Sequence, residues 1–136
     1  MKSKPAIVES KWHQDDFIQA FQKAQSGAYT INVANGWWDD RNTLIETSPK
    51  VTPLVVIGCL GLVTSEVAEA MEAARKHEFA TWGDTKTKDT LVRELAGTVI
   101  RCMDIAERFD LRLAEAIVEE IKANAERGFR HGGKAA

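Results

Sequence analysis

The sequence predicts an all-α protein, an antiparallel helical bundle that forms one domain over residues 1–136. Runs of β-branched residues are short and there are only three prolines, so little favours a sheet. Long segments carry apolar residues at helical spacing, and capping or helix-breaking residues separate these segments. A chain of this length can bury roughly two-thirds of its unfolded surface in a single core.

The first helix is predicted over residues 10–25, where the apolar side chains form one stripe. Ser26 and Gly27 are expected to end this helix. Residues 27–53 are expected to be the least regular part of the chain, and Asn35-Gly36 within them is a turn signal.

Three further helices are predicted after this irregular segment. Thr52-Pro53 provides a capping hydroxyl and a proline at the first helical position, so a helix is expected from there to about Lys76. Residues 77–88 are predicted to form a loop before a helix that ends near Arg108. Asp110 is expected to cap the last helix, over residues 111–127, and the chain ends, 1–9 and 131–136, are expected to be flexible. A bundle this small often completes its core by oligomerising, so a dimer or tetramer is expected.

Charge and hydropathy argue against two classes of partner. Lysine plus arginine total 18 against 20 aspartates and glutamates, a net charge of −2, which gives no basic field for nucleic acid. The longest apolar run, 54–63, is shorter than the roughly 20 residues that span a bilayer, so no membrane partner is expected. The N-terminus lacks an apolar segment behind its lysines, and a cytoplasmic protein is expected.

Three glutamates are expected to border the core. On a helical wheel, apolar residues flank Glu66 within about 40° and Glu69 lies about 60° away, while Glu94 borders the apolar stripe of the next long helix. Carboxylates gathered on facing helices need a cation or basic partners, because unpaired buried charge costs several kcal/mol. Hard oxygen ligands suit Mg²⁺, with Mn²⁺ as a substitute. The alternative is a set of salt bridges to the nearby arginines, Arg75, Arg93 and Arg101.

The sequence around these glutamates resembles that of a known family. Residues 61–75, GLVTSEVAEAMEAAR, and residues 94–104, ELAGTVIRCMD, are similar to the two metal-binding helices of MazG-like nucleoside triphosphate pyrophosphohydrolases, whose signature is E-x-x-E followed by E-x-x-D. NGWWDDR at 35–41 and NAERGFRHGGK at 124–134 resemble the phage and bacterial form. One position departs from the signature, because Gly97 stands where the family has aspartate.

The resemblance implies magnesium-dependent hydrolysis of a (deoxy)nucleoside triphosphate to the monophosphate and pyrophosphate, in house-cleaning of the nucleotide pool. It implies that Glu66, Glu69 and Glu94 hold the metal and that Glu69 takes a proton from the attacking water. Trp37 or Trp38 is expected to stack on the base, with the other in the core, and simple packing of the pair is the alternative. Asp104 is expected either to face the nucleotide or to pair with Arg101 or Arg108. The pyrophosphate is expected to meet polar groups near the last helix's end, or these groups form a solvated basic tail: Lys122, Asn124, Arg127, Arg130 and Lys134.

Gly97 leaves several functions open. The site can work with three carboxylates, the protein can bind nucleotide and metal without efficient turnover, or the residue was substituted to trap a complex. A third class of function is a helical oligomerisation module whose glutamates form salt bridges. Asp104 cannot replace the missing ligand, because it lies two turns, roughly 10 Å, beyond Gly97.

Overall fold

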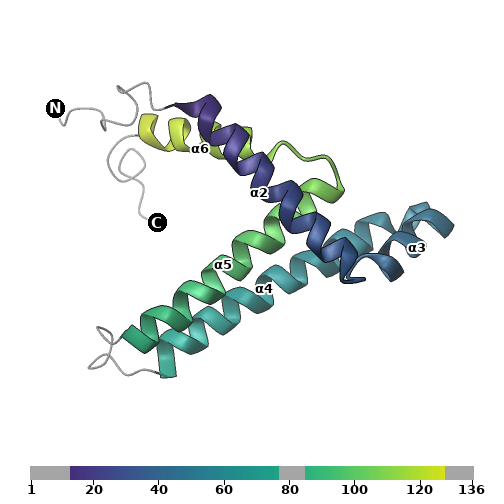
Figure 1. The fold of residues 1–136 in the computed structure, drawn as a ribbon, viewed down its shortest axis with the longest axis horizontal. Helices are drawn as coiled ribbons and strands as arrows, with labels where there is room; N and C mark the ends of the chain where they lie inside the picture. The colour runs from purple at the N-terminus through teal and green to yellow at the C-terminus, as the bar shows by residue number, and fades with distance from the viewer. Residues whose placement is uncertain (1–12, 77–84, 128–136) are drawn as a thin grey trace. The chain divides into compact units, whose positions relative to one another are not determined.

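The computed structural model describes residues 13–76 and 85–127, and within these ranges the fold is entirely helical. Five α-helices and one short 3-10 helix occur there, and no strand does. The elements are α2 (Gln14–Ala34), α3 (Asp39–Thr47), η1 (Pro49–Val51), α4 (Thr52–Lys76), α5 (Thr85–Arg108) and α6 (Leu113–Glu126). The prediction of an all-α helical bundle is confirmed at this level (Figure 1).

The chain divides into two compact units, and the division passes through α2. One unit joins residues 1–24 to residues 112–136, and the other is continuous from Gln25 to Leu111. In the first unit Phe17 and Phe21 pack ring against ring at 5.6 Å, and Gln22 Nε2 donates to Glu115 Oε1 over 3.2 Å. The second unit contains the three predicted metal ligands.

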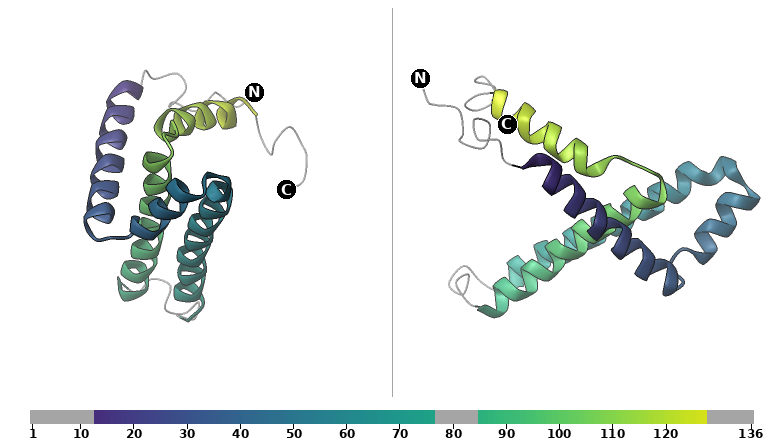
Figure 2. Two further views of the ribbon diagram at one scale, coloured as in Figure 1. Left: turned by 90° about the vertical axis from the view of Figure 1, so that its right-hand side faces the viewer. Right: turned by 45° about the horizontal axis from the view of Figure 1, so that its top comes forward.

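The antiparallel pair α4 and α5 forms the body of the second unit (Figures 1 and 2). α4 was predicted at its observed bounds, and α5 ends at Arg108 as predicted. The predicted loop over 77–88 is too long, because α5 already begins at Thr85. The core of this unit lies toward the α3 end of the pair, where four side chains are buried together: Trp38, Val55, Cys59 and Ile105.

The expected end of the first helix at Ser26-Gly27 is wrong, since α2 continues to Ala34. Two side chains hold this part of α2, because Ser26 Oγ and Gln25 Nε2 both donate to the Glu107 carboxylate, over 2.6 and 2.8 Å. These contacts offset the roughly 1 kcal/mol that glycine costs inside a helix. The turn instead comes at Gly36, whose φ of 78° is open to glycine. The irregular segment predicted over 27–53 is therefore largely helical.

The expected cap on the last helix is also wrong. Asp110 does not cap α6, which begins at Leu113 with Arg112 at its N-cap position. Asp110 instead has a φ of 53° and closes α5. The Leu111 amide donates to the Ala106 carbonyl over 2.8 Å and the Asp110 amide to the Glu107 carbonyl over 3.3 Å, which is the Schellman pattern.

A wide apolar surface remains exposed on α4. Leu54, Ile57 and Met71 are each more than 60% exposed, and Leu60 and Val67 extend the same stripe. Among the described residues, the stretch 49–76 is long and apolar enough to cross a bilayer by length and composition, a test that core helices of soluble proteins also pass. This differs from the expectation drawn from the run 54–63, which counted only uninterrupted apolar residues, whereas an 18-residue stretch that includes this run is apolar on average and has no more than two charged residues.

Candidate metal centre and adjoining pocket

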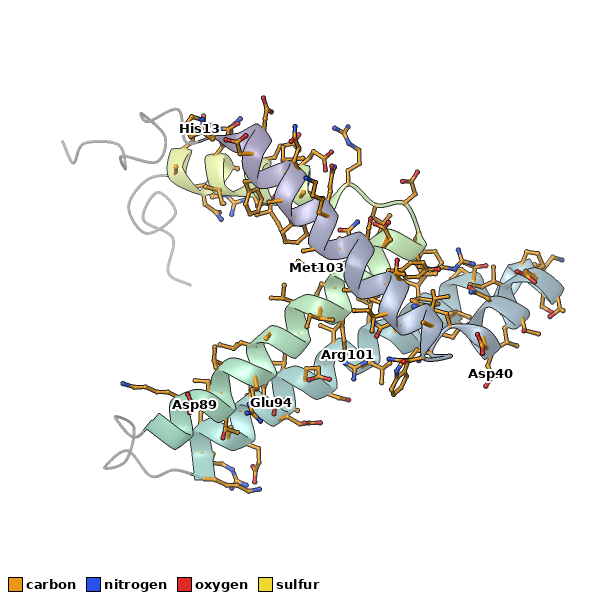
Figure 3. All side chains as sticks on the ribbon, in the orientation of Figure 1. His13, Asp40, Asp89, Glu94, Arg101 and Met103 are labelled. Atoms are coloured by element: carbon orange, nitrogen blue, oxygen red, sulfur yellow. The ribbon has the colours of Figure 1, made fainter. Side chains whose placement is uncertain are left out.

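Glu66 and Glu69 on α4 meet Glu94 on α5. One carboxylate oxygen from each lies within 4.8 Å of the other two. The antiparallel pairing of the helices brings residue 94 beside residues 66 and 69, and one helical turn separates the two glutamates of α4. Figure 3 shows Glu94 and Arg101 on α5, with Arg101 farther toward α3 than Glu94. The predicted ligands therefore lie together.

Negative charge in this cluster is incompletely balanced. The pKa of Glu94 is raised, first by the loss of surrounding water and then by the charges of Glu69 and Glu66 and hydrogen bonds to them. Sharing a proton between carboxylates relieves such repulsion, and so does a divalent cation. The donor set of three carboxylates from two facing helices thus fits Mg²⁺ or Mn²⁺ by its chemistry.

One arginine reaches the cluster from α5. Arg101 Nε donates to Glu66 Oε1 over 2.5 Å, and the side chains are 34% and 16% exposed respectively. Of the three arginines considered as salt-bridge partners, Arg101 takes this place, whereas Arg75 pairs with Glu72 on its own helix over 2.6 Å and Arg93 is exposed. The salt-bridge interpretation therefore accounts for one of the three glutamates.

Gly97 faces the same carboxylate. A Cβ atom built on Gly97 would lie 3.0 Å from Glu66 Cδ and closer still to Oε2, nearer than real Cβ atoms approach. The residue that departs from the family signature is therefore directed at the glutamate cluster. The Glu66 carboxylate occupies the space that any side chain at position 97 would take.

A pocket of about 200 Å³ adjoins Glu66 and Gly97 and extends along α5 toward the buried core. Its polar lining includes two guanidinium groups, from Arg41 and Arg101, and the amide of Asn32. Apolar side chains form the remaining wall, together with the two neighbouring tryptophans and Asp104. The volume is below the roughly 300–1,000 Å³ of pockets that enclose drug-sized ligands, so it can hold part of a nucleotide.

The two tryptophans have different environments. Trp38 is 1% exposed, and its indole nitrogen donates to both carboxylate oxygens of Asp104, over 3.1 and 3.0 Å. Trp37 is 55% exposed and lines the pocket, so it is the more accessible of the two indoles. Asp104 thus holds Trp38 at the pocket wall, while Arg101 pairs with Glu66 and Arg108 donates to Asn42 Oδ1 over 2.6 Å.

Arg41 was not anticipated as a site residue. Its guanidinium lies 5.5 Å from the Trp38 ring centre and donates to the Trp37 carbonyl. Residues four apart, such as Trp37 and Arg41, are neighbours on a helix. This contact was not expected from the sequence, because the segment was predicted to be irregular. Asn32 was missed for the related reason that α2 was expected to end before it.

The predicted pyrophosphate donors belong to the other unit or lie outside the described residues. Arg127 Nη1 donates to Asn124 Oδ1 over 3.0 Å at the end of α6, and Arg127 also lies 3.9 Å from Glu120. Lys134 and Arg130 fall outside the described residues. Their part in a site with the glutamates stays a prediction.

Comparison of the chain with protein-family models, with curated proteins and with solved structures found no match.

Proposed function

We propose that this protein is a magnesium-dependent nucleoside triphosphate pyrophosphohydrolase of the MazG-like type. The observation that carries the proposal is the continuity of the glutamate cluster with a pocket that contains Trp37, Arg41 and Arg101. A site for a nucleoside triphosphate needs three neighbouring features. These are a cation site for the phosphates, guanidinium groups that balance the phosphate charge, and an aromatic ring that stacks on the base.

The chain's own residues would divide the work as follows. Glu66, Glu69 and Glu94 would hold Mg²⁺, which screens phosphate charge and makes a bound water more acidic. Glu69 is the exposed member of the three and would accept the proton of the attacking water. Arg101 would bind phosphate oxygens, and Trp37 would stack on the base while Asp104 keeps Trp38 in place behind it.

Self-association belongs to the same proposal. Besides the exposed apolar stripe on α4, α5 also exposes apolar side chains, and Val92, Leu95 and Val99 are about half exposed. Apolar patches of this kind on a small helical protein are covered by another surface, and a second copy would also enclose the part of the nucleotide that the pocket leaves outside. We expect a dimer or tetramer in the cytoplasm. A folded protein that sediments as a 15.1 kDa monomer at micromolar concentration would contradict this expectation.

A second candidate function is nucleotide binding with weak turnover, and the orientation of Gly97 favours it. A metal held by three carboxylates leaves one more coordination position to water or phosphate than the family signature would. Misplacing the attacking water by about 1 Å can cost a hundredfold in rate, so binding would survive better than catalysis.

The deciding experiment is pyrophosphate release from a panel of ribo- and deoxynucleoside triphosphates with Mg²⁺, using the wild type, Glu66→Gln and Gly97→Asp. Release that Glu66→Gln abolishes supports the enzyme, and faster release by Gly97→Asp shows that position 97 serves the metal. Nucleotide and Mg²⁺ raising the Tm without release would support the binder. If neither pyrophosphate release nor a Tm shift is observed, the remaining candidate is an oligomerisation module with salt-bridged glutamates.

A further inference from the structure

The Glu66–Arg101 contact joins the glutamate cluster to the pocket. Arg101 lines the pocket and at the same time donates to Glu66, so one guanidinium faces both a carboxylate of the cluster and the space for an anion. A cation bound at Glu66 would compete with Arg101 for the negative charge of the Glu66 carboxylate. An anion in the pocket and Glu66 compete for the same guanidinium.

Gly97 makes this contact possible. In the observed arrangement the Glu66 carboxylate occupies the position where a Cβ at residue 97 would stand. Any side chain there would force Glu66 to swing, which is easy because the clash involves the far end of a flexible side chain. Glycine at 97 therefore leaves Glu66 free to sit close to α5, within reach of Arg101.

We propose that Arg101 is exchanged between Glu66 and a phosphate group when a divalent cation binds the glutamates. In the metal-free protein Arg101 neutralises Glu66. Once the cation takes Glu66, the guanidinium is released into the pocket beside Arg41, where it binds an anionic oxygen of the ligand. Metal and anion then strengthen each other's binding by the same factor, because a coupling free energy is reciprocal. The inference rests on the proposed metal site and concerns the order and coupling of binding there.

Three variants separate exchange from a simple effect of charge. Arg101→Gln removes the competitor of the metal, while Arg93→Gln removes an equal charge from an exposed position on the same helix. Gly97→Ala keeps every charge but pushes Glu66 away from its present position. Mn²⁺ binding, followed by the electron paramagnetic resonance signal of the free ion in 0.15 M salt, should tighten about three- to fivefold in Arg101→Gln and in Gly97→Ala. This is the size expected from no longer breaking a partly exposed ion pair.

The control should bind Mn²⁺ like the wild type, since an exposed charge is screened at this ionic strength. Equal tightening in Arg93→Gln and Arg101→Gln, or wild-type affinity in Gly97→Ala, would overturn the exchange. If the wild type and all three variants bind no Mn²⁺, the proposed metal centre itself fails and the exchange fails with it.

The side-chain Nε–H resonance of Arg101, identified by its loss in Arg101→Gln, gives a second and direct readout. It should shift on addition of Mg²⁺ alone, as the Glu66 contact breaks, and shift again when inorganic phosphate is added. Inorganic phosphate should bind severalfold more tightly with Mg²⁺ present than without, and this coupling should be smaller in Arg101→Gln, where only the direct attraction between Mg²⁺ and phosphate remains. Mn²⁺ binding with an unmoved Arg101 signal would overturn the exchange and leave the metal centre standing.

Discussion

Two regions of the α4–α5 pair are built on different principles. At the α3 end, Trp38 is enclosed by Tyr29 and Phe109 at ring distances of 5.8 and 6.1 Å, and its single polar atom is satisfied by Asp104. Near the middle of the pair, three carboxylates meet with one arginine among them and the pKa of Glu94 is raised. The aromatic end is complete within the chain, whereas the glutamate cluster retains charge that a cation would balance. The pocket joins the two regions, so Trp38, which stabilises the aromatic end, also forms part of the wall of the proposed ligand site.

The most disruptive test of this contrast is Trp38→Ala. Removing a fully buried indole should lower the free energy of unfolding by about 3–5 kcal/mol, through lost burial and the cavity left behind. Trp38→Phe keeps a ring but leaves Asp104 without its donor, and should cost less. Chemical denaturation of the three proteins measures the difference. A loss below about 1 kcal/mol for Trp38→Ala would mean that the aromatic end does not hold the unit together.

Glu107 anchors α2 to α5 at the same end, and its replacement should have the next largest effect. The pKa of Glu107 is lowered by hydrogen bonds from Ser26 and then Gln25, so its charge stabilises the fold above the ordinary pKa of glutamate and stops doing so as pH falls through the lowered value. Glu107→Ala should cost about 1–3 kcal/mol at pH 7 and less in acid. Gln25 would then lose its partner while only 6% exposed. A deficit that does not change between pH 7 and pH 3 would contradict this account.

Asp110 offers a smaller effect of opposite sign. Its φ of 53° is strained for a residue with a Cβ, and its charge lies at the carboxyl end of α5, where the helix dipole disfavours it. Asp110→Gly should stabilise the protein by roughly 0.5 kcal/mol after the greater unfolded-state entropy of glycine is counted. Asp110→Ala is the matched control and should gain less or lose stability. The urea denaturation midpoints of the two variants test this. A higher midpoint for Asp110→Ala than for Asp110→Gly would contradict backbone strain at residue 110.

The smallest effect is expected at the glutamate cluster. Because the folded-state pKa of Glu94 is raised, the metal-free fold is favoured when Glu94 is protonated and loses that contribution as pH rises through the raised value. Glu94→Gln should therefore raise the Tm slightly at pH 7 without metal, and the gain should vanish below about pH 4. Mg²⁺ should raise the Tm of the wild type more than that of Glu94→Gln. A variant less stable than the wild type at pH 7 without metal would show that Glu94 is not under repulsion.

The sequence was informative where a local signal coincided with tertiary packing. Thr52-Pro53 predicted the start of α4, and the wheel position of Glu66 beside apolar neighbours predicted that it would border the facing helix. Ser26-Gly27 misled because long-range hydrogen bonds to Glu107 outweigh a local helix-breaking signal. The pairing of Arg101 with Glu66 was one of several open alternatives, since it depends on the register of α5 against α4, which residue spacing within either helix does not determine.

Gly97 also has an evolutionary consequence. Glycine and aspartate codons can differ by a single base, so a lineage could restore the fourth carboxylate in one mutational step. That step would displace Glu66 from its place against α5 and so deprive Arg101 of its partner. The benefit of a change at 97 therefore depends on which residues stand at 66 and 101, which is epistasis of the kind expected between residues in direct contact. Among descendants of this sequence, we expect these three positions to change together rather than one at a time.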